Sequence, residues 1–121
     1  MVRPGNVATA VSRVVLRSGY HVNSDRPGDE YLVPLRLTWN AAPLEVAGVK
    51  YPEPEIRRYP FAEKPLPVFT GSFEIRTRFR APDSAPRGPG TITGKLRYQA
   101  CTEKLCLPPK TVSISLPVEI E

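Results

Sequence analysis

Cys101 and Cys106 are the residues of this chain best suited to chemistry. Four residues separate them, and alternating apolar positions flank the pair on both sides. A period of two over such a length is typical of half-buried β-strands. A short connection between two strands predicts an antiparallel pair, whose facing Cα atoms lie about 4.5–5.5 Å apart. A disulfide tolerates that separation, so we predict a disulfide-capable pair on a hairpin. The alternating positions are Ile92, Gly94, Leu96, Tyr98 and Ala100, then Val112, Ile114, Leu116, Val118 and Ile120.

The stabilising effect of this disulfide would be small. On the chain-entropy model, closing a loop of about six residues contributes roughly 2 kcal/mol, against about 4.7 kcal/mol for 100 residues. Two strands already joined by a hairpin gain little from a local link, so the spacing leaves redox exchange open without favouring it. A plain structural disulfide is the alternative. A metal site is a weaker third interpretation, because two thiols without a nearby His or further Cys rarely form one.

Length and proline content predict the fold class. A chain of 121 residues is typical of a single domain, here residues 1–121. Its 15 prolines exclude long helices, because proline is not tolerated in helix interiors. About seven short strands separated by turn residues predict an immunoglobulin-like antiparallel β-sandwich. The strands expected before the final hairpin are residues 7–16, 31–39, 44–51 and 68–80, the last with a bulge at Gly71–Ser72.

Charge and hydropathy exclude several other classes. The net charge is +5, but the charges are scattered, and Arg76, Arg78 and Arg80 alternate as on the solvated face of a sheet. No zinc-finger spacing or RNA-binding aromatic signature accompanies them, so we expect no nucleic-acid partner. The apolar runs are too short to insert into a membrane. His21 is the only histidine, and we interpret it as a hydrogen-bonded structural residue.

Two stretches carry a resemblance to a known family. The segment from Tyr98 to Lys110 reads Tyr-Gln-Ala-Cys, four residues, then Cys-Leu-Pro-Pro-Lys. It resembles the active-site segment of the N-terminal domain of the DsbD family of thiol:disulfide interchange proteins. The stretch from Gly19 to Leu35 also resembles an early signature of that family. The similarity extends over residues 7–118, and the family's fold is itself immunoglobulin-like.

The resemblance implies roles for individual residues. Cys106 corresponds to the cysteine that forms mixed disulfides with partners, and Cys101 to the one that resolves them. In the family, an aromatic residue on a loop covers the pair until a partner docks. Phe61 is the first candidate for this shield and Tyr59 the second, with ordinary loop anchoring as the alternative. Two further residues beside the motif could orient the site or simply pack in the strands: Tyr98 and Gln99.

The resemblance also implies a cellular context. We expect a periplasmic or otherwise extracytoplasmic domain that passes electrons from a thioredoxin-like or transmembrane dithiol donor to oxidised proteins. No cofactor is expected, and we expect a monomer. Residues 1–6 are expected to be an artificially added start or flexible, and the domain to derive from a longer protein. The alternative is a non-catalytic immunoglobulin-like binding module with a structural disulfide.

Overall fold

The computed structural model describes residues 1–121 and contains strands and loops but no α-helix. No helix is therefore present that could span a membrane. The strands are β1 (Val7–Val15), β2 (His21–Asn23), β3 (Arg36–Asn40), β4 (Glu45–Lys50), β5 (Glu55–Arg57), β6 (Leu66–Thr70), β7 (Ser72–Arg80), β8 (Gly88–Tyr98), β9 (Ala100–Cys101) and β10 (Lys110–Ile120).

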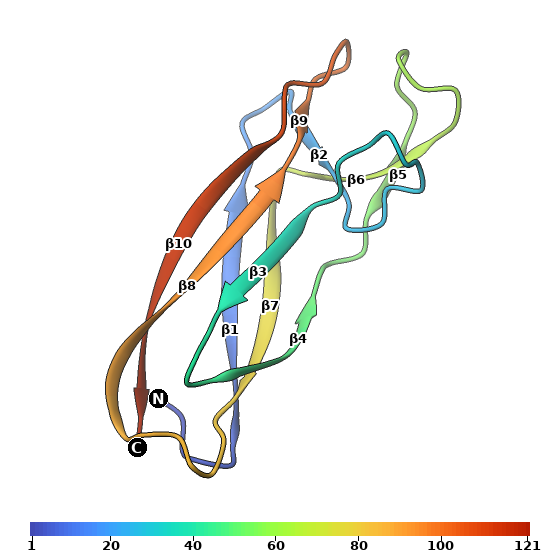
Figure 1. Cartoon of the computed structure of the whole chain (residues 1–121). Helices are drawn as coiled ribbons and strands as arrows, with labels where there is room; N and C mark the ends of the chain where they lie inside the picture. Colours follow the sequence, from blue (N-terminus) through green and yellow to red (C-terminus); the bar gives the residue numbers. More distant parts are fainter.

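Two three-stranded antiparallel sheets form a sandwich, with strand orders β1-β7-β4 and β10-β8-β3 (Figure 1). Their strands alternate between buried and exposed residues, so each sheet offers one apolar face to the other. Trp39 of β3 crosses this core and packs edge-on against Phe79 of β7, with ring centroids 5.1 Å apart. Its indole Nε1 donates a hydrogen bond to Thr77 Oγ1 at 3.0 Å, so the buried polar atoms are paired.

A third sheet, with strand order β5-β6-β2-β9, forms one end of the molecule (Figure 1). Its strands continue those of the sandwich. The chain passes from β6 into β7 through Gly71, whose φ of 64° favours glycine, and from β8 into β9 through Gln99. Both sandwich sheets therefore extend into this end sheet and fix its position.

The structure corrects three predictions made from the sequence. The strand expected over residues 31–39 begins only at Arg36, and Tyr31 lies in a turn with 86 % of its surface exposed. Gly71–Ser72 is not a bulge but the point where the chain changes sheets, which alternation alone does not reveal. A flexible start is wrong at Val2, which is buried and pairs with Ile120 at the end where both termini lie (Figure 1).

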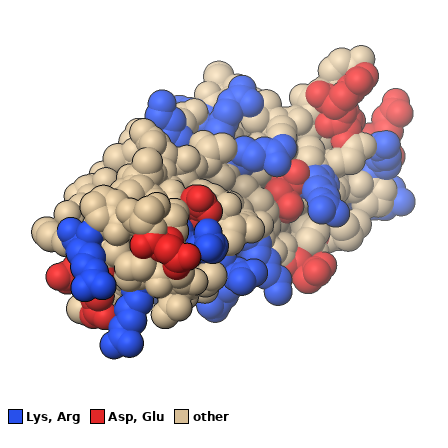
Figure 2. Space-filling view, turned by 60° about the horizontal axis from the view of Figure 1, so that its bottom comes forward, with Lys and Arg blue, Asp and Glu red and all other residues tan.

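Surface charge is mixed in the face that Figure 2 presents, with Lys and Arg beside Asp and Glu. The four ion pairs of the molecule join exposed side chains, for example Arg80 and Glu45 at 3.3 Å. Exposed pairs of this kind contribute at most about 1 kcal/mol each. The fold therefore depends on its apolar core and its strand ladders.

Gly94 provides a test of the sandwich packing. It is buried in β8, between Trp39 on one neighbouring strand and Ile114 on the other. A Cβ added there would lie 2.9 Å from Trp39 Cε3 and 3.0 Å from Ile114 Cγ1. We expect Gly94→Ala to lower the free energy of unfolding by about 1–3 kcal/mol through overpacking. Chemical denaturation measures this loss.

Gly90 is the matched control on the same strand. Its added Cβ would meet only Val118 Cγ2, at an ordinary contact distance of 3.9 Å. We expect Gly90→Ala to leave stability unchanged or to raise it by up to about 1 kcal/mol, because alanine restricts the unfolded chain. Equal losses in the two variants would contradict the packing described for Gly94.

Candidate functional site

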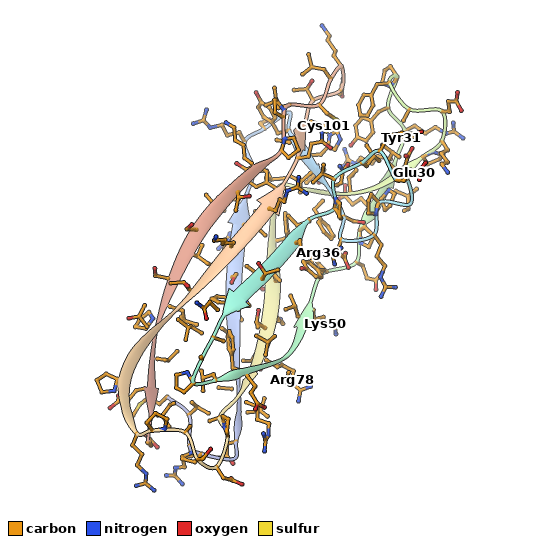
Figure 3. The ribbon with its side chains drawn as sticks, viewed as in Figure 1. Glu30, Tyr31, Arg36, Lys50, Arg78 and Cys101 are labelled. Atoms are coloured by element: carbon orange, nitrogen blue, oxygen red, sulfur yellow. A yellow bond between two sulfur atoms is a disulfide. The ribbon has the colours of Figure 1, made fainter.

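Cys101 and Cys106 form a disulfide at the end of the molecule that the third sheet forms (Figure 3). The predicted disulfide-capable pair is confirmed, but the Cα atoms lie 3.9 Å apart, closer than expected for two facing strands. Cys101 pairs with β2 through the short strand β9, while Cys106 meets Cys101 only in an isolated bridge. β8 and β10 form the long hairpin, and the cysteines lie beyond its paired residues.

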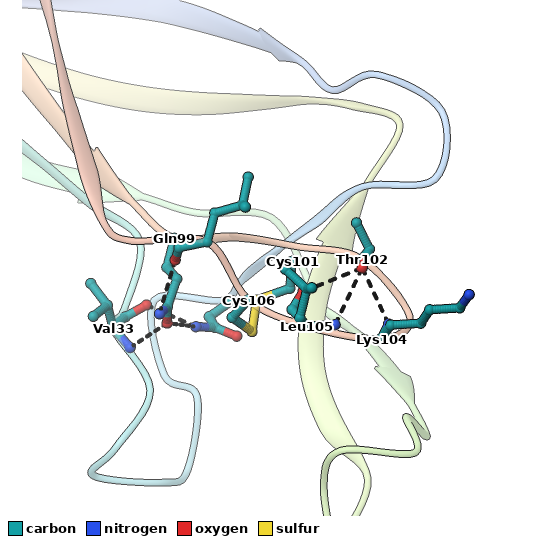
Figure 4. Close-up of a disulfide and its surroundings, with 9 residues drawn as sticks. Val33, Gln99, Cys101, Thr102, Lys104, Leu105 and Cys106 are labelled. Atoms are coloured by element: carbon teal, nitrogen blue, oxygen red, sulfur yellow. Dashed lines mark hydrogen bonds between the residues drawn. A yellow bond between two sulfur atoms is a disulfide. The ribbon is translucent and has the colours of Figure 1, made fainter.

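The residues between the cysteines form a hydrogen-bonded turn (Figure 4). Thr102 N donates to Leu105 O at 2.8 Å. Thr102 Oγ1 accepts hydrogen bonds from the backbone N–H groups of Lys104 and Leu105, at 3.2 and 3.3 Å. A Thr side chain commonly orders a turn in this way. The turn keeps the ends of the loop together independently of the sulfur–sulfur bond.

The two cysteines differ in accessibility. Cys101 is 0 % exposed, because it lies in the ladder between β2 and the Cys106 bridge. Cys106 lies outside that ladder and is half-buried. A thiolate arriving from solvent therefore reaches Cys106 more easily than Cys101.

Gln99 fixes the base of the site (Figure 4). Its Oε1 accepts hydrogen bonds from Asn23 Nδ2 at 3.2 Å and Val33 N at 3.3 Å. Its Nε2 donates to Leu107 O at 3.3 Å. Leu107 N donates in turn to Ala100 O at 2.8 Å. One side chain thus ties β2, the loop before β3 and the chain leaving Cys106 to the β8–β9 junction.

An aromatic stack lies beside the disulfide. His21 of β2 faces Cys101 directly in the antiparallel ladder, so their side chains share one face of the sheet. The His21 ring stacks on Tyr59, with centroids 4.1 Å apart and an interplanar angle of 14°. Phe61 stacks on the Tyr59 ring at 5.4 Å and lies 6.3 Å from His21. The loop between β5 and β6 thereby packs over the row of residues that contains Cys101.

Burial shifts the ionisation of two of these rings. The pKa of His21 is lowered, first by burial and then by the charge of Arg57. The pKa of Tyr59 is raised, mainly by burial; Arg57 opposes this shift, while Glu55 and Glu103 add to it. Near neutral pH, His21 is therefore predominantly uncharged and Tyr59 keeps its proton.

A cleft of about 430 Å³ opens beside the stack. Charged and polar groups from separate segments meet in it: Arg17, Tyr20, His21, Arg57, Tyr59, Thr70 and Glu103. A larger hollow of about 590 Å³ lies beside Lys50, Phe73 and Arg76, and no cysteine lines it. No group of three or more His, Cys, Asp or Glu side chains gathers as a metal site would require.

The structure brings most of the candidate residues together. Tyr59 stacks on His21, which faces Cys101, and Phe61 stacks on Tyr59. Gln99 lies at the base of the site. Tyr98 instead faces Lys110 in the β8–β10 ladder and packs on the sandwich core.

Sequence reasoning missed the place of His21. The expectation that it is hydrogen-bonded is wrong at Nε2, which is buried without a hydrogen-bonding partner in the protein. Asn23, which donates to Gln99, was also missed. Both residues belong to the Gly19–Leu35 stretch. Its resemblance to the family signature was the one sequence feature that could have drawn attention to them.

Comparison with known proteins agrees with this geometry. The family described as "Thiol:disulfide interchange protein DsbD, N-terminal" matches residues 1–117. The crystal structure of the Neisseria meningitidis DsbD N-terminal domain in the reduced form is similar, with a TM-score of 0.60 and 16 % sequence identity. The match covers 90 % of this chain and 76 % of that one, which confirms the predicted immunoglobulin-like sandwich. No curated protein matches the chain.

Proposed function

Because this chain belongs to the family of DsbD N-terminal domains, which are extracytoplasmic thiol–disulfide exchange modules, we propose that its Cys101–Cys106 pair relays electrons between two redox partners. The donor is a thioredoxin-like or transmembrane dithiol protein, and the acceptors are oxidised proteins of the periplasm. In this proposal the domain acts as a protein-disulfide reductase. Its monomeric state and its origin in a longer chain stay predictions.

The unequal burial of the two cysteines is the observation that supports this function most directly. Cys106 is half-buried and the more accessible of the two to an incoming thiolate, whereas Cys101 is fully buried. Exchange proceeds by attack on one sulfur and formation of a mixed disulfide. Cys106 is then the residue that joins the partner, and Cys101 is the thiol that resolves the mixed disulfide.

The absence of a helix favours a shuttle over an autonomous oxidant. Thioredoxin-type sites depress a thiol pKa with the N-terminus of a helix. This chain has no helix to supply that effect. The pair therefore depends on a partner whose own thiolate attacks the disulfide, or whose docking changes the surroundings of the sulfurs.

The β5–β6 loop supplies the proposed shield. Tyr59 is buried and contacts His21, which faces Cys101 across the sheet. Phe61 lies further out, 38 % exposed, and stacks on Tyr59. We assign Phe61 to the movable outer part of the shield and Tyr59 to its anchor, because Tyr59 also packs in a small core with Leu66 and Val68.

Replacement of single cysteines tests the assigned roles. We expect Cys106→Ser to abolish mixed disulfides with a thioredoxin-like partner, because the accessible sulfur is gone. Cys101→Ser should accumulate them, because the resolving thiol is gone. Non-reducing electrophoresis measures the trapped complex, and the double Ser variant is the blank. Equal trapping by the two single variants would contradict the roles, and trapping by neither would contradict exchange.

Alanine replacement in the loop tests the shield. We expect Phe61→Ala to raise the rate at which dithiothreitol reduces the disulfide, because the thiolate must approach along the S–S axis. Its cost in stability should be about 1 kcal/mol, below the roughly 3–5 kcal/mol of a core aromatic. Reduction rate and denaturation midpoint are measured on the same sample.

Tyr59→Ala is the comparison, since Tyr59 is buried and should show the larger loss of stability. If Phe61→Ala lost much stability without any gain in the native-state reduction rate, Phe61 would be an ordinary packing residue.

A further inference from the structure

His21 is a buried titratable residue with no role in the function proposed above. Only 3 % of its surface is exposed, and its Nε2 has no hydrogen-bonding partner in the protein. Leaving such a polar atom unpaired is costly, so natural proteins rarely do so without a reason. The residue directly opposite His21, in the ladder between β2 and β9, is Cys101.

The register brings the ring and the sulfur to the same face of the sheet. Directly opposed residues of an antiparallel pair have Cβ atoms about 4.5–5.5 Å apart. The stacked Tyr59 ring packs against one face of the imidazole and limits its movement. Cys101 itself is fully buried, so solvent does not readily accept its proton. The unpaired imidazole nitrogen of His21, on the strand opposite, is a group that could accept it.

We propose that His21 accepts the proton of the Cys101 thiol when Cys101 resolves a mixed disulfide on Cys106. The inference rests on the exchange function proposed above and adds a proton acceptor to it. General-base assistance requires a neutral base within reach of the thiol. Burial of His21 favours the neutral form of its imidazole.

The Cys101 thiol gives its proton to the imidazole, and the resulting thiolate attacks Cys106 Sγ. The Cys101–Cys106 bond forms, the bond from Cys106 to the partner sulfur breaks, and the partner leaves as a thiolate with the electron pair. The imidazolium then releases its proton to that thiolate or to solvent. Overall, the two cysteines are oxidised and the partner disulfide is reduced.

Other titratable groups near His21 fit the role less well. Tyr59 keeps its proton at neutral pH because burial raises its pKa. Arg57, Arg17 and Tyr20 line the same cleft and supply no carboxylate. Thr70 faces His21 from β6, and its hydroxyl donates to Glu55, which is paired with Arg57. Glu103 is the one remaining carboxylate in the cleft, and it is exposed.

The lowered pKa of His21 determines how the rate of resolution should depend on pH. Since the pKa of His21 is lowered, the neutral base is present at pH 7 and is lost only as the pH falls through a value below its usual one of about 6.5. Without the imidazole, the thiol must ionise unaided, so the rate of resolution should keep rising as the pH is raised into the alkaline range. The rates of resolution with and without the His21 imidazole therefore differ most near neutral pH and converge at alkaline pH.

Stopped-flow reaction of the reduced protein with dithiobis(nitrobenzoate) isolates the step. The first release of thionitrobenzoate is bimolecular and forms the mixed disulfide on Cys106; the second is unimolecular and reports resolution by Cys101. We expect His21→Phe, which keeps an aromatic ring against Tyr59, to slow the second phase about tenfold at pH 7. The first phase should be unchanged, and alkaline pH should restore the second.

Two control variants separate this role from others. Thr77→Val removes the buried acceptor of Trp39 in the sandwich and should lower the unfolding midpoint without changing the second phase. Glu103→Gln removes the rival carboxylate and should leave the second phase unchanged. If His21→Phe destabilises the fold too far, His21→Gln keeps a polar side chain and should show the same slowing.

Three results would overturn the inference. The first is a second phase as fast in the His21 variants as in the wild type at pH 7. The second is a slowing that alkaline pH does not restore, which indicates a packing role. The third is a slowing in Glu103→Gln instead. A wild-type protein without any unimolecular phase would refute the exchange function itself, so the two failures are distinguishable.

Discussion

The pairing of β9 with β2 is the constraint on which the site depends. It places the buried Cys101 opposite His21 on the edge strand of the end sheet, and Cys106 meets Cys101 from outside that sheet in an isolated bridge. β9 is only two residues long, so its position comes from β8, which continues into it through Gln99. The hydrogen bonds of Gln99 to Asn23, Val33 and Leu107 fix that junction. A sandwich built from ordinary apolar packing thus presents two chemically unequal cysteines at its end.

The surroundings of the disulfide combine a rigid base with a looser cover. Hydrogen-bonded groups, among them the buried Asn23 and the half-buried Gln99, form the base. The proposed cover is the β5–β6 loop, whose Tyr59 and Phe61 rings stack with His21. Stacked rings contribute about 0.5–1.5 kcal/mol each beyond their buried area, little enough for a docking partner to displace the outer one. Such an arrangement suits a redox pair that must stay protected between encounters.

Much of the fold could be predicted from the sequence, because its signals are local. Alternation over residues 7–16 and around Gly94, together with the prolines, indicated strands and excluded helices. Alternation does not reveal when a chain changes sheets, so the switch at Gly71 was taken for a bulge. The cysteine pair was evident from its spacing and its neighbours. The contact between His21 and the cysteine strand joins distant parts of the chain, and no local pattern encodes it.

The reduction potential of the Cys101–Cys106 disulfide tests the central claim most directly, because the hydrogen-bonded turn at Thr102 would also suit a purely structural bond. Structural disulfides of extracytoplasmic proteins have potentials below about −300 mV, whereas exchange-active bonds lie higher. Equilibration of the purified domain with glutathione and dithiothreitol buffers gives the value. The account predicts a potential well above about −300 mV. A value below it would show that the disulfide serves the fold, and would contradict a relay of electrons through this pair.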